Sequence, residues 1–202
     1  MNIQRKIDNI IQKNNSLVCV GLDPVLEKLP EHLRQKENAF FEFNKAIIDA
    51  THDLVCAFKP NSAFYEALGD RGVAQLKMTC DYLRTTYPEV FIILDAKRGD
   101  IGSSNEGYVK YAFDYLNVDA LTVMPYMGIE SLAPFFNRSG RGIIIGCHSS
   151  NPGAKANDVD SIGVTYGYGT KEELEKANPT YSVDSVEGLK EYLLSNTYFA
   201  KV

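Results

Sequence analysis

Short apolar runs alternate with longer amphipathic stretches along most of the chain. The apolar runs predict buried strands, because strands covered on both faces are apolar almost throughout; they are residues 17–21, 55–58, 91–94, 120–124, 142–147, 162–165 and 181–183. Helices are predicted where apolar residues recur at helical spacing, in residues 1–15, 39–52, 72–86, 105–116, 129–136, 171–177 and 186–194. The repeated strand–helix order predicts a parallel sheet covered by helices, which is an α/β fold.

Two architectures fit this order, a (β/α)8 barrel of the TIM-barrel type and an open doubly wound sheet. The strand count leaves the choice open, because a barrel has eight strands and usually about 250 residues. Polar groups at several successive strand ends are typical of the carboxyl-terminal face of a barrel, whereas an open sheet collects them at one crevice. We therefore predict a barrel for the first five units, whose strand ends carry Asp23, Lys59, Asp95 with Lys97, and Ser149 with Ser150.

Composition and charge narrow the classes of function. The 202 residues are 45% hydrophobic and 23% charged, which is ordinary for a globular domain. The net charge of −5 argues against a nucleic-acid partner, and no apolar run reaches the ~18 residues of a membrane helix. The N-terminus lacks the features of a signal peptide. We expect a cytoplasmic protein in which Cys19, Cys56 and Cys147 are reduced thiols of core strands.

The strongest chemical signal is the segment ILDAKRGDIG at the end of the third strand. Asp95 and Lys97 are two residues apart, so on an extended strand end both face the same side. Asp100 comes after Gly99, which permits a turn. Lys59 directly follows the second strand and is costly to bury without a carboxylate partner, for which Asp95 on the adjacent strand is the natural candidate. Such a set is either a salt bridge that stabilises the strand ends or a catalytic cluster.

Five motifs occur in an order that resembles orotidine 5′-phosphate decarboxylases, particularly their longer bacterial and archaeal branch. The motifs are GLDP at 21–24, FKPNSAFYE at 58–66, DAKRGDIG at 95–102, TVMPYMG at 122–128 and SSNPGA at 149–154. The resemblance covers residues 1–154. It implies a carbon–carbon lyase of pyrimidine synthesis that needs neither metal nor cofactor and converts orotidine 5′-monophosphate to uridine 5′-monophosphate. No set of His, Cys and Glu residues stands at metal-ligand spacing.

The resemblance also implies roles for individual residues. Lys97 would protonate C6 of the pyrimidine as carbon dioxide leaves, with Asp95 against the substrate carboxylate and Lys59 in the charge network. Asp100, with Ile101, would reach into the active site of a second subunit, so that a homodimer is required. The residues that would bind the nucleotide are Asp23, Ile101, Ser104, Ser150 and Pro152.

The decarboxylase pattern ends after Ala154. Residues 153–195 are similar to the C-terminal part of haloacid dehalogenase-type phosphatases, although the nucleophile motif DxDx[TV] and the metal-binding GDxxxD of those enzymes are absent from the sequence. The Gly-rich loop and the late arginine with which the decarboxylases grip the 5′-phosphate are not found either. We therefore expect a chimera of a barrel segment at 1–154 and a C-terminal α/β segment at 155–202. The barrel would be incomplete or completed by the grafted segment.

Two alternative functions stay open. One is an inactive remnant that binds a nucleotide weakly or only oligomerises, because loss of the phosphate grip removes binding energy that supports the reaction. The other is a different barrel of the same superfamily, such as a hexulose-phosphate synthase or a sugar-phosphate decarboxylase. Those enzymes need magnesium, and they lack the sequence context in which GLDP and SNPGA occur here.

Overall fold

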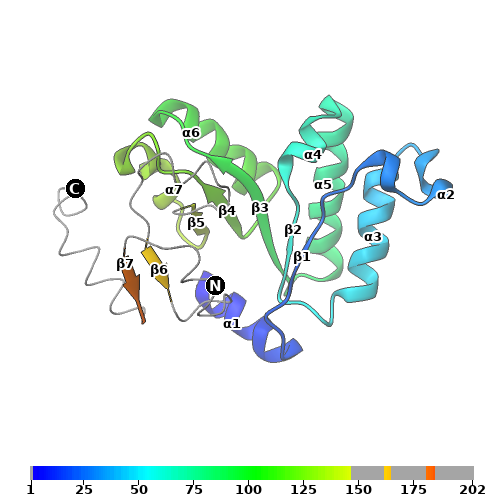
Figure 1. Ribbon diagram of the computed structural model, residues 1–202, viewed down its shortest axis with the longest axis horizontal. Coiled ribbons are helices and arrows are strands. Elements are labelled where there is room, and N and C mark those ends of the chain that lie inside the picture. The colour runs from blue at the N-terminus through cyan, green and yellow to red at the C-terminus, as the bar shows by residue number, and fades with distance from the viewer. Residues whose placement is uncertain (1, 147–161, 165–180, 185–202) are drawn as a thin grey trace. The chain divides into compact units, whose positions relative to one another are not determined.

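The central sheet of the described chain is parallel. The computed structural model describes residues 2–146, 162–164 and 181–184. Because neighbours in this sheet are also consecutive in sequence, right-handed crossovers place the connecting helices on one face. This is the order of a (β/α)8 barrel of the TIM-barrel type, whereas a doubly wound sheet reverses its order at a switch point. The strands, in spatial order, are β1 (Cys19–Gly21), β2 (Ala57–Lys59), β3 (Phe91–Arg98), β4 (Ala120–Val123) and β5 (Gly142–Ile145) (Figure 1).

Helices make up most of the connections. Two side chains cap helix starts: Asn2 accepts the Gln4 N–H at 2.9 Å, and Asn61 accepts the Ala63 N–H at 3.1 Å. The segment η2 is a π-helical continuation of α6, and η1 and η3 are 3-10 helices. The helical segments are α1 (Ile3–Asn14), η1 (Leu26–Lys28), α2 (Glu31–Arg34), α3 (Ala39–Thr51), α4 (Ser62–Glu66), α5 (Gly69–Thr86), α6 (Gly102–Val109), η2 (Lys110–Tyr115), η3 (Ile129–Leu132) and α7 (Ala133–Phe136).

The chain divides into two compact units. The larger comprises Met1–Met127 with Ser131–Ile145 and contains the sheet of β1 to β5. The other comprises Gly128–Glu130 with Gly146–Val202, and in it β6 (Ile162–Val164) pairs in parallel with β7 (Tyr181–Val183). The domain boundary predicted at residue 154 lies among residues 147–161, outside the described residues, and stays a prediction.

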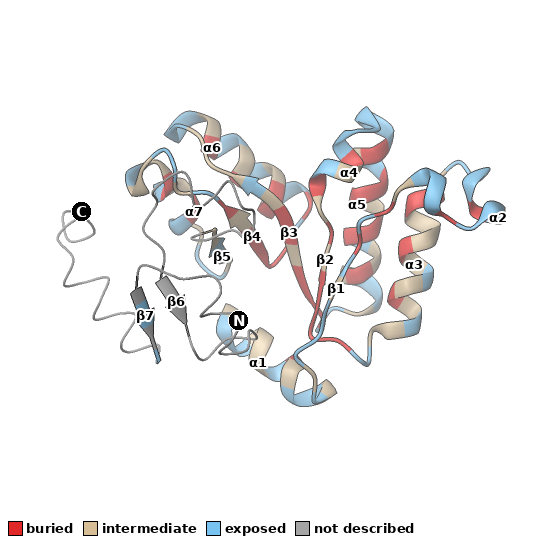
Figure 2. Ribbon diagram, in the orientation of Figure 1, coloured by how far each residue is buried: buried red, intermediate tan, exposed pale blue. Residues whose placement is uncertain are grey.

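The core of the larger unit lies between the sheet and its helices. Figure 2 shows buried residues concentrated on β2, β3 and β4 and along one side of α3 and α5. Phe58, Ile92 and Leu121 on the strands are fully buried, as is Leu76 on α5. Each such side chain contributes roughly 1.5–3 kcal/mol of hydrophobic stabilisation. The apolar strand pattern therefore reflects burial on both faces of the sheet.

A buried polar network connects the helices to the end of β1. The Asn44 side-chain amide on α3 donates to the Tyr65 hydroxyl at 2.8 Å and to the Thr79 hydroxyl at 3.1 Å. Tyr65 in turn donates to the Leu22 carbonyl oxygen at 2.7 Å. Because Leu22 precedes Asp23, this network fixes the backbone from which one of the predicted binding residues projects.

Asp119 forms an ionic hub at the opposite, amino-terminal end of the strands. Its carboxylate lies 2.8 Å from Lys6 Nζ of α1 and 2.8 Å from Arg84 Nη2 of α5. It also accepts the backbone N–H of Ile92 at 2.9 Å. Burial lowers the pKa of Lys6, and the Asp119 carboxylate opposes that shift. Asp119 thus holds two helices against β3 and β4.

The structure confirms the seven predicted strands, although β3 continues to Arg98, beyond its predicted end at residue 94. The short segments η1, α2 and α4 were not predicted, because they are too short to show a helical period. One core prediction is wrong: Cys19 is exposed, since β1 pairs with β2 alone among the described strands. The helices predicted at 171–177 and 186–194 and the thiol of Cys147 lie outside the described residues.

No helix among the described residues combines the length and the apolar character needed to cross a lipid bilayer.

Candidate active site

Charged side chains converge at the carboxyl ends of β2 and β3. Lys59 Nζ lies 3.0 Å from Asp95 Oδ2, and Lys97 Nζ lies 2.7 Å from Asp95 Oδ1. The side chain of Asp95 is 11% exposed, that of Lys59 33% and that of Lys97 60%. One nearly buried carboxylate therefore holds two ammonium groups, one on each oxygen. The predicted pairing of Lys59 with Asp95 and the predicted common side of Asp95 and Lys97 are both present.

Backbone contacts between β2 and β3 bring these side chains together. Asp95 N–H donates to the Pro60 carbonyl oxygen at 2.9 Å, and Asn61 and Asp95 form a parallel bridge beyond the last regular pair. The strands therefore stay adjacent past the end of β2. The carboxyl ends of parallel strands meet at the same edge of a sheet, which is why Lys59 and Asp95 come close although 36 residues separate them.

Burial raises the pKa of the Asp95 carboxyl, but hydrogen bonds from Lys97, Lys59 and Thr122 outweigh that effect and hold its pKa below the ordinary value. The carboxylate thus stays ionised at neutral pH, and so it can orient both ammonium groups. It contributes folding stability above the ordinary carboxyl pKa, and that contribution is lost as the pH falls through the depressed value.

Thr122 belongs to this site although its sequence position in an apolar strand did not mark it. Its hydroxyl donates to Asp95 Oδ1 at 2.9 Å. The Thr122 hydroxyl oxygen in turn accepts the backbone N–H groups of Ala96 at 3.0 Å and of Lys97 at 2.9 Å. Lys97 has φ +47°, in the left-handed region that residues with a side chain seldom adopt. The Lys97 end of the cluster is therefore built on an irregular backbone.

Asp23 lies at the end of β1 and is exposed. Its Oδ1 accepts the backbone N–H of Asn61 at 3.0 Å, which ties the turn after β1 to the turn after β2. Among the described residues, the other carboxylate oxygen makes no hydrogen bond and so leaves an acceptor for a ligand hydroxyl. Asp23 is thus placed beside the segment that carries Lys59.

Asp100 takes no part in the ion pairs that join Lys59, Asp95 and Lys97. Its Oδ1 accepts the Ile101 N–H at 2.6 Å, and its backbone is clamped by the buried side chain of Asn105, which accepts the Asp100 N–H and donates to the Asp100 carbonyl. Among the described residues no ion pair joins Asp100 to the cluster of its own chain. Its place within reach of Asp95 and Lys97, which the spacing suggested, therefore stays a prediction.

The role of Gly99 differs from the one that the sequence suggested. A Cβ atom at Gly99 would lie 2.2 Å from the Met124 carbonyl oxygen, closer than any real contact of this kind. Glycine is therefore needed for the close approach of the loop to the end of β4, since the backbone conformation at Gly99 is not itself left-handed.

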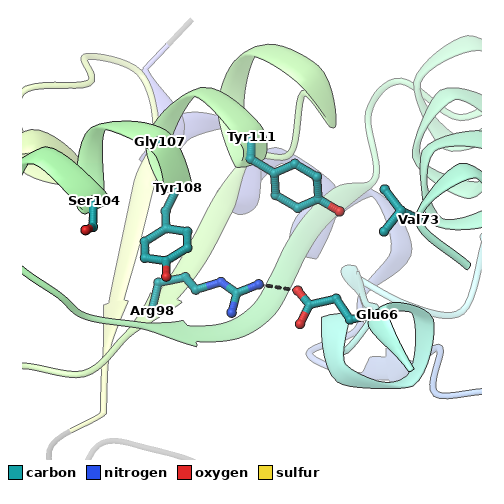
Figure 3. Close-up of a pocket in the computed structure, with 7 residues that line it drawn as sticks. All are labelled: Glu66, Val73, Arg98, Ser104, Gly107, Tyr108 and Tyr111. Carbon is teal, nitrogen blue, oxygen red and sulfur yellow. Dashed lines mark hydrogen bonds and ion pairs between the residues drawn. The ribbon is translucent and has the colours of Figure 1, made fainter. Parts of the chain in front are cut away.

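Ser104 and Arg98 face a separate cavity of about 480 Å³ (Figure 3). Arg98 forms an ion pair with Glu66 of α4, and its guanidinium lies 4.9 Å from the centre of the Tyr108 ring. Lys97 and Arg98 are adjacent in sequence but have different partners: Lys97 pairs with Asp95, and Arg98 pairs with Glu66. The residues that line the cavity are Glu66, Val73, Arg98, Ser104, Gly107, Tyr108 and Tyr111.

Two predicted binding residues, Ser150 and Pro152, lie outside the described residues. Within the part of the chain that is described, no group of three or more His, Cys, Asp and Glu side chains lies close enough together to hold a metal ion.

Comparisons of the sequence and of the structure with known proteins all point to the same family. The sequence profile described as "Orotidine 5′-phosphate decarboxylase / HUMPS family" matches residues 16–189. An orotidine 5′-phosphate decarboxylase of Flavobacterium johnsoniae is 49% identical over 154 residues, which are 76% of this chain and 56% of that protein. The protein of the same name from Herpetosiphon aurantiacus is 51% identical over 149 residues, 74% of this chain and 54% of that one.

Among solved structures, the Leishmania donovani OMP decarboxylase superposes with a TM-score of 0.66 at 33% identity, covering 77% of this chain and 57% of that chain. The chain thus spans about half the length of the curated relatives it matches. The family match continues through residues 155–189, which we expected to be part of a phosphatase-like segment, and none of these comparisons supports that second resemblance.

Proposed function

Because the chain belongs to the orotidine 5′-phosphate decarboxylase / HUMPS family, we propose that it decarboxylates orotidine 5′-monophosphate to uridine 5′-monophosphate in pyrimidine synthesis. The observation that carries this proposal is the pair of ammonium groups held by one nearly buried carboxylate, Lys59–Asp95–Lys97. A mutually neutralising set of this kind persists in a site with little water, where its electrostatic effect is largest.

In the proposed reaction the bond between C6 and the carboxyl carbon breaks, and its electron pair stays on C6. A proton from Lys97 Nζ forms the new C6–H bond, carbon dioxide leaves, and solvent reprotonates the neutral amine. An ammonium fixed near C6 stabilises the negative charge as it develops there. Asp95 holds that ammonium in place through the 2.7 Å contact and lies against the substrate carboxylate.

The remaining roles concern nucleotide binding. We assign Lys59 and Asp23 to the ribose hydroxyls, because Lys59 belongs to the cluster and Asp23 is tied to the turn that follows Lys59. Ser150 is assigned to the edge of the pyrimidine ring, and Ser104 and Pro152 to nucleotide binding, on the strength of the family resemblance alone. These assignments need neither a metal nor a cofactor in the chemical step.

We further propose a homodimer in which Asp100 and Ile101 complete the site of the partner subunit. Asp100 makes no ion pair with the cluster of its own chain among the described residues, and the Ile101 side chain beside it is exposed. Exposed apolar side chains also follow β4, where Met124 is 40%, Tyr126 91% and Met127 49% exposed. Apolar groups gathered at one end of a sheet are typical of an interface.

The shared site predicts that two inactive variants restore each other. Lys97→Ala and Asp100→Ala chains are each expected to lose turnover, since each lacks one group from every site. After equal amounts are mixed and the subunits re-equilibrated, about a quarter of wild-type activity is expected, because half of the dimers are mixed and each has one intact site. The measurement is turnover of the mixture against each variant alone. A mixture as inactive as its components contradicts the shared site.

Two alternatives remain. The first is an inactive remnant that binds a nucleotide weakly or only oligomerises. A magnesium-dependent relative is favoured by the breadth of the matched family, whose description includes HUMPS. The cytoplasm remains our proposed compartment, since Cys19, Cys56 and Cys80 are free thiols.

The proposal is tested by the loss of orotidine 5′-monophosphate absorbance with the purified chain in the presence of EDTA. Metal-independent turnover is expected. A folded chain without turnover excludes the proposed function and leaves both alternatives. Magnesium-dependent turnover of a sugar phosphate by the same sample then identifies the other superfamily member, and no turnover of either substrate identifies the remnant. Cooperative thermal unfolding of the same sample establishes that the chain is folded.

A further inference from the structure

Thr122 uses the full hydrogen-bonding capacity of its hydroxyl at the junction of β3 and β4. A hydroxyl has one proton to donate and two lone pairs that accept. Here the two lone pairs receive the N–H groups of Ala96 and Lys97, at 3.0 and 2.9 Å. The remaining neighbour, Asp95 Oδ1 at 2.9 Å, therefore receives the proton. The direction of each bond follows from this count.

The two N–H groups need this acceptor because the strand ladder is interrupted beside them. Leu94 lies opposite Leu121, and the next pair is Arg98 opposite Val123. Residues 95–97 of β3 thus face residue 122 alone on β4. A bulge of this kind leaves backbone groups of the longer strand without ladder partners. The Thr122 side chain takes two of them.

The bulge also contains Lys97, the reacting lysine, whose backbone conformation is unfavourable. Lys97 has φ +47°, where a side chain crowds the backbone, so this conformation persists only if its surroundings hold it. The ion pair with Asp95 is a weak restraint by itself, because the Lys97 side chain is 60% exposed and has many rotamers to lose. The hydrogen bond from Lys97 N–H to Thr122 acts on the backbone directly.

We propose that Thr122 is the positioning residue of the reacting lysine: its hydroxyl fixes the β3 bulge that aims Lys97 at the substrate and orients Asp95 at the same time. This inference rests on the proposed function of the Lys59–Asp95–Lys97 cluster. It gives a polar side chain in the middle of an apolar strand a specific task that valine, of nearly the same shape, cannot perform.

The test compares Thr122→Val, Thr122→Ser and Thr51→Val. Thr51 is a matched control, because its hydroxyl donates to the Ile47 carbonyl within α3 and makes no contact with the cluster. In the wild type, NMR hydrogen exchange is expected to show protected amides at Ala96 and Lys97. Thr122→Val is expected to speed exchange of both amides at least about tenfold and to lower kcat by about 10²-fold with KM changed only slightly. Thr122→Ser is expected to retain protection and most of kcat, and Thr51→Val to change neither.

The two measurements separate the inference from the proposed function. If the wild-type chain shows no turnover, the proposed function fails, and amide exchange alone decides the positioning role. Unprotected wild-type amides, protection retained in Thr122→Val, or the same loss of kcat in the serine and valine variants overturns the inference. If Thr122→Val does not fold, Thr122→Ala removes the same three bonds without placing a methyl group against Asp95 and is judged by the same outcomes.

Discussion

A Lys97→Ala chain is expected to lose at least about 10³-fold in kcat for orotidine 5′-monophosphate while it keeps its fold. The variant removes both the proposed proton donor and the charge nearest the developing carbanion. No other described ammonium takes its place, because Lys59 is already held on the other oxygen of Asp95. Loss of a surface ion pair changes stability by no more than about 1 kcal/mol. Turnover and the urea midpoint, measured on the same preparation, separate the two effects.

The matched control is Lys13→Ala. The Lys13 side chain is also 60% exposed and also forms an ion pair, with Glu89, but it lies on α1. Its replacement is expected to leave kcat within a factor of about two. Lys97→Arg is a second comparison, since a guanidinium keeps the charge but is too weak an acid to deliver the proton. Wild-type kcat in Lys97→Ala would remove this lysine from the reaction.

Asp119→Ala is expected to destabilise the chain by about 3–5 kcal/mol, enough to unfold much of it at room temperature. The Asp119 side chain is 7% exposed, and those of Lys6 and Arg84 are 12% and 15% exposed. Removing the carboxylate leaves two largely buried cations and the Ile92 N–H without their acceptor. An unpaired buried charge is among the most damaging changes that a single substitution makes.

Two variants calibrate this effect. Asp119→Asn keeps an oxygen for the Ile92 N–H and is expected to be less harmful than alanine. Asp81→Ala removes an i,i+4 partner of Lys77 on α5, where the carboxylate is 52% exposed, and is expected to change stability by less than about 0.5 kcal/mol. Urea unfolding followed by circular dichroism provides the free energies. A urea midpoint of Asp119→Ala equal to that of Asp81→Ala would contradict the stabilising role of Asp119.

The predictable part of the site is the part determined by strand ends and charge. Lys59 and Asp95 follow apolar strands that are neighbours in a consecutive parallel sheet, and neither charge is easily buried alone. Those two considerations suffice to pair them. The position of Lys97 on the same side as Asp95 was predicted from the alternation of side chains along a strand, even though the strand is bulged at that residue.

The unpredicted part depends on register and on distant contacts. Threonine in an apolar run is typical of any strand, so Thr122 carries no signal until the offset between β3 and β4 is known. Asp119 pairs with Lys6, which is 113 residues away in sequence, and no local sequence pattern predicts that contact. Asn105 holds the loop at Asp100 by three hydrogen bonds, and the spacing of Asp95 and Asp100 along the chain carries no sign of them.

The fold shows the same division. Strand–helix alternation was sufficient to predict the parallel sheet, and polar groups at successive strand ends favoured the barrel over the doubly wound sheet. The short helices α2 and α4 were not predicted because each spans little more than one helical turn. The exposed position of Cys19 depends on which strands flank β1, and an apolar run does not contain that information.

A structure of this chain with uridine 5′-monophosphate bound tests the central claim most directly. The predicted result is a pyrimidine ring with C6 facing Lys97 Nζ, the ribose beside Lys59 and Asp23, and Asp95 still bridging the two ammonium groups. A nucleotide seated elsewhere, for example in the cavity between Arg98 and Tyr111, or a chain that binds no nucleotide at millimolar concentration, would contradict it.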